Sequence, residues 1–130
     1  MKDIPFIKYY DIGPYPGVWF GVTNNPGNFK KELNRLGITQ EVNFINPGFN
    51  AMAHRFINKD ELNLIVTFKH IETNPEYMTY GLLVHEAVHV WRMLLDYIGD
   101  NCNDHDEIEA YHIQNIAQCL IKYYIDHRDN

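Results

Sequence analysis

The stretch Tyr80-Gly-Leu-Leu-Val-His-Glu-Ala-Val-His-Val-Trp91 lies inside the longest helix that this 130-residue chain predicts, and it decides the expected fold. Apolar residues surround His85, Glu86 and His89 on nearly every side, so we expect the helix to be buried. Asn74 with Pro75 predicts its start, because asparagine caps helices and proline suits the first helical position. Gly99 predicts its end. We expect a helical segment over 74–99, with the helix itself at about 75–98.

His85 and His89 are four residues apart and therefore project from one face of this helix. Two imidazole nitrogens can then bind one metal ion, while Glu86 at the edge of the same face can reach a water beside it. The H-E-x-x-H pattern is the layout of a zinc hydrolase, in which the carboxylate is the general base. The alternative interpretation is a solvated helix face without a metal. We favour a metal because buried polar side chains need partners.

The N-terminal half predicts mainly strands and one short helix. Residues 4–10 and 18–23 are rich in β-branched and aromatic residues, and turn signals separate them. Residues 24–27 predict another turn, and apolar spacing over 29–36 predicts a short amphipathic helix. Two more strands are expected at 51–57 and 62–68, joined by a loop of hairpin length.

The expected fold class is α+β: a small antiparallel or mixed sheet packed on the H-E-x-x-H helix and on a C-terminal helix over 105–126. Length predicts a single domain over 1–130, in which 1–73 holds the strands and the short helix. The strand at 62–68 is the more apolar one and should be central. The strand at 51–57 is our candidate for an edge strand that pairs with substrate backbone, although an ordinary core strand is an equal alternative. We interpret His54 on that strand first as a structural residue and only second as a site residue.

A catalytic zinc site needs a third protein ligand. A short connection makes the last helix an antiparallel neighbour of the H-E-x-x-H helix. The early turns of the last helix should therefore pass near His89. The candidates are Asp96, Asp100, Cys102, Asp104, His105, Asp106, Glu107, Glu109 and His112. The apolar face of the last helix favours Glu109 as the inward carboxylate over Glu107. Either glutamate could instead close a capping box with the aspartate three residues before it.

His85-Glu86-x-x-His89 followed by Glu107-Ile-Glu-Ala110 resembles the gluzincin peptidases, whose third ligand is a glutamate on a later helix. The resemblance implies a zincin-like fold, Zn²⁺ as cofactor, and Glu107 as third ligand, with Glu109 as the alternative. Many gluzincins have an aspartate after that alanine, where this chain has Tyr111. Residues 84–114 also resemble short phage and prophage proteins, which implies a minimal gluzincin of phage type.

Composition excludes some function classes. The net charge of −6 argues against nucleic-acid binding. No apolar run approaches the ~18 residues of a membrane span, and no signal peptide is evident. Two cysteines, Cys102 and Cys119, are too few for a disulfide scaffold. We therefore expect a cytoplasmic protein, in the host cytoplasm if a phage encodes it.

The expected function is zinc-dependent hydrolysis of a peptide or protein substrate. Glu86 would be the general base, and Tyr111 or His112 could help to hold the oxyanion. Two alternatives stay open. One is a non-catalytic phage accessory or peptide-binding protein that keeps the fold and the metal site, and the other is an acidic inhibitor of a host protein.

Overall fold

The computed structural model describes residues 4–69, 73–99 and 106–128. Four strands and three helices follow one another along the chain. They are β1 (Lys8–Tyr10), β2 (Val18–Thr23), α1 (Pro26–Arg35), β3 (Ala51–Asn58), β4 (Glu61–Phe68), α2 (Glu76–Ile98) and α3 (Asp106–His127). The protein is thus a small α+β fold, as the sequence predicts.

The strands form one mixed sheet in the order β1-β2-β4-β3. β1 pairs antiparallel with β2, β2 pairs parallel with β4, and β3 pairs antiparallel with β4. The central position expected for 62–68 is confirmed, because β4 lies between β2 and β3 and is buried from Leu62 to Phe68. The edge position expected for 51–57 is confirmed as well.

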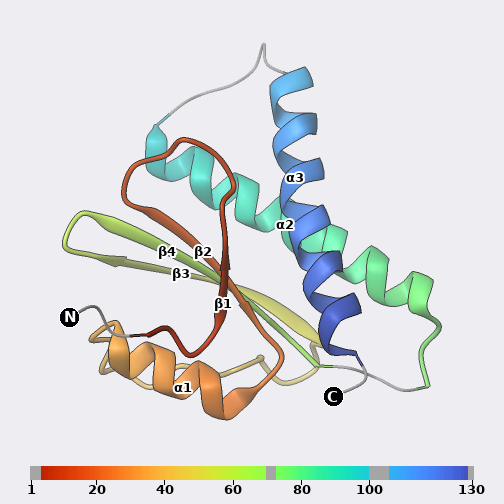
Figure 1. Ribbon diagram of the computed structural model, residues 1–130, viewed down its shortest axis with the longest axis horizontal. Helices are drawn as coiled ribbons and strands as arrows, with labels where there is room; N and C mark the ends of the chain where they lie inside the picture. The colour runs from red at the N-terminus through yellow and green to blue at the C-terminus, as the bar shows by residue number, and fades with distance from the viewer. Residues whose placement is uncertain (1–3, 70–72, 100–105, 129–130) are drawn as a thin grey trace.

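Helices cover both faces of the sheet (Figure 1). α2 and α3 lie on one face, where their apolar side chains form the larger core with Phe20, Leu64 and Phe68 of the sheet. α1 covers the other face over a smaller core around Phe29 and Ile65. Burial on both faces explains why β4 is apolar nearly throughout.

α3 runs antiparallel to α2, as expected from the short connection. Near the start of α3, Glu109 contacts Trp91, while Arg128 past its end pairs with Glu76 at the start of α2. The expected boundaries of both helices are correct within one residue. Gly99 ends α2 in the left-handed conformation, with φ of 72°.

Three local expectations were wrong. The N-cap of α2 is Pro75, without a side-chain hydrogen bond, rather than Asn74. α1 begins at Pro26 rather than at 29, because the Asn25 side chain accepts a hydrogen bond from the Asn28 amide at 2.9 Å and caps the helix. The turn expected at 24–27 is therefore partly the first helical turn. β1 begins only at Lys8, four residues later than expected, because that is where its pairing with β2 starts.

The two-residue turn Lys59-Asp60 fixes how β3 pairs with β4. Both residues have positive φ, 51° and 65°, as in a type I′ hairpin. Asn58 and Glu61 close the hairpin, so even-numbered residues of β3 pair their main-chain groups with β4. The main-chain groups of Ala51, Ala53 and the later odd-numbered residues face outward from the sheet edge.

His54 belongs to the smaller core and has the structural role that we expected first. It is 4% exposed, and its ring lies 4.8 Å from that of Phe29. Its Nε2 lies 3.2 Å from the Phe44 carbonyl oxygen and 2.9 Å from the Thr67 hydroxyl. Because a carbonyl oxygen only accepts, Nε2 carries the proton. Burial lowers the pKa of His54 to about 4, and the Phe44 carbonyl offsets this only in part.

We predict that His54 makes the fold sensitive to mild acid. Its pKa is about 4 when folded and about 6.5 when unfolded, so the unfolded state binds the proton first as pH falls. The contribution of neutral His54 to the free energy of unfolding is present above about pH 6.5. Protonation of this residue in the unfolded state should lower that free energy by about 2 kcal/mol between pH 7 and pH 5. Urea unfolding of the wild type and of His54→Gln at both pH values isolates the effect. Equal pH dependence in the two proteins would refute this assignment.

Candidate functional site

α2 places His85, Glu86 and His89 at the margin of its buried face. Leu83, Ala87, Val90 and Leu94 are fully buried against the sheet and α3. Glu86 is 5% exposed, whereas both histidines are exposed. We expected burial on nearly every side. That was wrong for Val84 and Val88, which are 41% and 36% exposed, because no described element covers the outer side of α2.

The two histidines point their outer ring nitrogens at each other. Nε2 of His89 lies 3.1 Å from Nε2 of His85, and the ring planes meet at 73°. Two imidazole ligands of one tetrahedral zinc ion lie about 3.4 Å apart, given Zn–N distances of about 2.0–2.1 Å. Spacing and donor type therefore fit a shared metal ion after a shift of a few tenths of an ångström.

Glu86 is a buried carboxylate without a hydrogen-bond donor among the described residues. Burial raises its pKa, and the positive charge available on His85 and His89 opposes this shift. Buried carboxylates normally accept several hydrogen bonds. A carboxylate that accepts no hydrogen bond from the described residues and lies beside two imidazoles suits a general base that takes a proton from water.

A cavity of about 280 Å³ opens beside these three residues. Its other walls come from the loop before β3, from the start of β3 and from α2. The lining residues outside the motif are Asn46, Phe49, Ala51, Met52, Ala53 and Met93. Apart from Asn46, the lining residues outside the motif are apolar, so the cavity suits an apolar side chain.

The β3 edge lies along this cavity. The outward main-chain groups of Ala51 and Ala53 are therefore beside Glu86 and the histidine pair. Asp96 lies about one helical turn beyond Met93 on α2. Arg55 of β3 donates a hydrogen bond to it at 2.7 Å and so joins the strand to the helix. The cavity is thus bounded by a strand edge on one side and by the polar motif on the other.

None of the third-ligand candidates whose side chains the structure describes lines the cavity. Glu109 accepts a hydrogen bond from Trp91 Nε1 at 2.9 Å and pairs with Arg92 at 3.0 Å, while Glu107 is exposed. Within the part of the chain that the structure describes, no group of three histidine, cysteine or acidic residues is placed to hold a metal. Four candidates lie outside the described residues. They are Asp100, Cys102, Asp104 and His105.

The two candidate oxyanion residues also lie away from the cavity lining. Tyr111 is 65% exposed. His112 lies 2.5 Å from the Tyr15 hydroxyl through Nε2 and 2.8 Å from the Ile108 carbonyl through Nδ1. Its ring is 4.5 Å from that of Trp91. These contacts tie α3 to α2 and to the turn before β2, which is a structural role.

Sequence reasoning missed three residues of the cavity wall. Met93 is four residues after His89, so helical spacing could have placed it beside the motif. Asn46 and Phe49 come from a segment that showed only turn signals. Nothing in their pattern indicated that the loop returns to the β3 edge.

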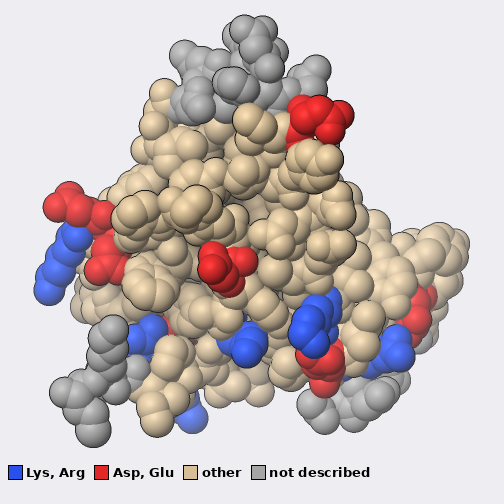
Figure 2. All heavy atoms as spheres, turned by 45° about the horizontal axis from the view of Figure 1, so that its top comes forward, with Lys and Arg blue, Asp and Glu red and all other residues tan. Residues whose placement is uncertain are grey.

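Charge is scattered on the visible surface. Figure 2 shows basic and acidic side chains interspersed on the face that it presents, with no single large patch of either sign among the residues described there. In the described part of the chain, no helix has the length and apolar character that crossing a bilayer requires.

Comparisons with protein-family models, with curated proteins and with solved structures find no match for this chain.

We predict that the Glu86 carboxylate lowers the free energy of unfolding of the metal-free protein. Its raised pKa means that stability is lost as pH rises above the unfolded value of about 4.3. Glu86→Gln should therefore increase the free energy of unfolding at pH 7 by about 1 kcal/mol. The gain should shrink toward zero near pH 4. Glu107→Gln, at an exposed carboxylate, should change stability little and is the control. Destabilisation by Glu86→Gln in chelator at pH 7 would contradict the account.

Proposed function

We propose that the chain is a zinc-dependent metallopeptidase that hydrolyses peptide bonds at the cavity between β3 and α2. The observation that carries the proposal is the buried, donor-free carboxylate of Glu86 next to the facing Nε2 atoms of His85 and His89. A structural metal site does not require such a carboxylate. A water-activating site does.

His85 and His89 would hold the ion, with a carboxylate of α3 as third ligand. Glu107 is the third ligand that the gluzincin resemblance implies. Glu109 is the alternative, and it would have to leave Trp91 Nε1 and Arg92, which engage its carboxylate, to bind the ion. When bound, Zn²⁺ supplies a Lewis acid that lowers the pKa of water toward about 7 and polarises a carbonyl.

The chain's own residues supply the remaining steps. Glu86 takes the proton from the attacking water and passes it to the leaving amine. The outward main-chain groups of Ala51 and Ala53 pair with an extended peptide and align its scissile bond. Phe49 and Met93 line the space for an apolar substrate side chain.

The second candidate function is a non-catalytic peptide-binding or phage accessory protein with a zincin-like fold. One observation favours it. Arg92 and Trp91 engage Glu109, and the described residues complete no three-ligand site. Such a protein would use the β3 edge and the cavity to hold a peptide without cleaving it.

Metal content and peptide cleavage, measured on the same preparations, test the proposal. The wild type should bind about one zinc per chain and cleave a mixed peptide library. His85→Ala should lose the metal, and Glu107→Ala beside Glu109→Ala identifies the third ligand. Glu86→Gln should keep the metal and lose at least about 100-fold in kcat.

Two results would overturn the proposal. One is a wild type that stays metal-free after incubation with excess zinc. The other is a Glu86→Gln variant that cleaves as fast as the wild type. Zinc binding and peptide binding without any cleavage would instead favour the peptide-binding protein.

A further inference from the structure

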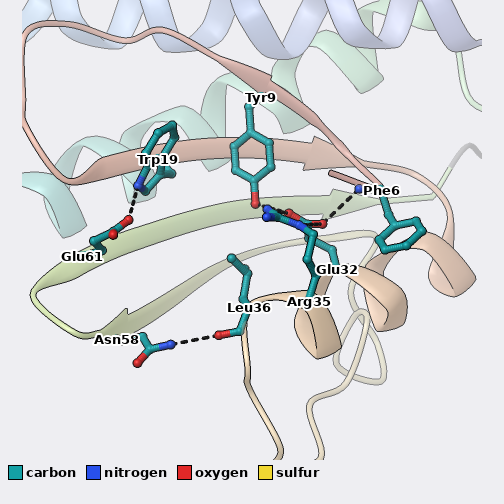
Figure 3. Close-up of polar contacts among 8 residues, drawn as sticks. All are labelled: Phe6, Tyr9, Trp19, Glu32, Arg35, Leu36, Asn58 and Glu61. Carbon is teal, nitrogen blue, oxygen red and sulfur yellow. Dashed lines mark hydrogen bonds and ion pairs between the residues drawn. The ribbon is translucent and has the colours of Figure 1, made fainter. Parts of the chain in front are cut away.

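A second, larger cavity lies on the opposite face of the sheet. Its volume is about 590 Å³, within the range of small-molecule sites. It lies between the C-terminal end of α1 and the strands β1, β2 and β4. Figure 3 shows Tyr9, Trp19, Arg35 and Glu61 of its wall, and Asn63, which is not drawn there, also lines it.

An aromatic corner forms part of the wall. The Trp19 side chain is 48% exposed although it lies on a strand, and its ring meets that of Tyr9 at 85° with centroids 6.5 Å apart. Gly21 makes room for this arrangement, because a Cβ there would lie 3.1 Å from the Tyr9 ring. An exposed indole next to a second ring is a surface on which flat groups and cations bind.

Asn63 gives the cavity an unpartnered polar group. The residue is 4% exposed and lines the cavity, yet its amide has no hydrogen-bond partner among the described residues. Cross-strand pairing sets it opposite Trp19, so both side chains project from the same face of the sheet. No side-chain oxygen or nitrogen of the described residues is buried without a hydrogen-bond partner, so the Asn63 amide is open to the cavity, where a ligand can bind it.

Among the described residues that line the cavity, Glu61 carries the charge that no ion pair offsets. Arg35 lines it, but its Nε and Nη2 atoms donate to both oxygens of Glu32 at 2.8 and 2.5 Å, which offsets its charge. Burial raises the pKa of Glu32, but hydrogen bonds from Arg35, Tyr9 and the Phe6 main chain outweigh it and keep the carboxylate ionised. Glu61 accepts a hydrogen bond from Trp19 Nε1, and no cation pairs with it among the described residues.

We propose that this cavity binds a guanidinium group, as carried by arginine. The flat cation stacks on the exposed Trp19 ring. Its N–H groups donate to the free lone pairs of the Glu61 carboxylate and to the Asn63 amide oxygen, which project from one face of β4 two residues apart. The ligand thus supplies the cation that Glu61 lacks and the partner that Asn63 lacks.

Tryptophan fluorescence tests the inference on the whole chain. Trp91 is 1% exposed and gives a constant background, so quenching reports on Trp19. The probes are L-arginine, L-lysine and L-citrulline, the last being the neutral isostere of arginine. Arginine should quench saturably, and citrulline should bind about tenfold or more weakly because the charge-assisted bonds are lost. Lysine should be weaker than arginine, since it lacks the flat, forked donor set.

Variants connect the signal to the cavity. Glu61→Gln should weaken arginine binding about tenfold or more while keeping Trp19 and the fold. Glu41→Gln, at an exposed carboxylate elsewhere, should leave it within about twofold. Asn63→Ala should also weaken binding, and circular dichroism checks that it folds.

A short peptide with one central arginine separates the two sources of the group. Tighter binding of the peptide than of free arginine identifies a protein or peptide partner, and the reverse identifies the free amino acid. Either result upholds the guanidinium site. Absence of saturable quenching, equal binding of citrulline, or an unchanged affinity in Glu61→Gln would overturn it.

Discussion

The burial of one side of α2 is the constraint on which the arrangement of this protein depends. Leu83, Ala87 and Leu94 must leave water, and they can do so only against the sheet and α3. With 3.6 residues per turn, this fixes His85 and His89 at the border of the buried stripe, toward the β3 edge. The positions of the cavity and of the paired imidazoles beside the edge strand therefore follow from the burial of this side of α2.

Two buried carboxylates show how differently this fold treats charge. Glu32 is fully buried and accepts hydrogen bonds from Arg35, from Tyr9 and from the Phe6 main chain. It holds α1 to β1 and is fully satisfied. Glu86 is almost as buried and has no donor among the described residues. A carboxylate that the fold buries without pairing it is common at catalytic sites, and this contrast with Glu32 is what motivates the role proposed for Glu86.

The sequence predicted the elements whose pattern is strong and local. The span of α2 followed from Pro75 and Gly99, and the central position of β4 from its apolar composition. The start of α1 was missed because the Asn25 cap makes Pro26 and Gly27 helical despite their turn character. Local signals also predicted the helix on which His85, Glu86 and His89 lie.

The rest of the site could not be predicted because it depends on long-range contacts. Asn46 and Phe49 reach the cavity through the path of a loop, which no periodicity encodes. The partner of Glu109 depends on how α3 lies against Trp91 and Arg92, a packing detail of the two helices. Asn63 looked like an ordinary polar residue in an apolar strand, and only the sheet register shows that it lies beside Trp19 above a cavity.

The most direct test of the central claim is the location of a metal ion by anomalous diffraction from crystals grown with zinc. The account predicts one strong peak within about 2.1 Å of Nε2 of both His85 and His89, beside the Glu86 carboxylate. It also predicts that a carboxylate of α3 completes the coordination. Zinc that is absent from the space between these two nitrogens, or bound only elsewhere on the surface, would contradict it.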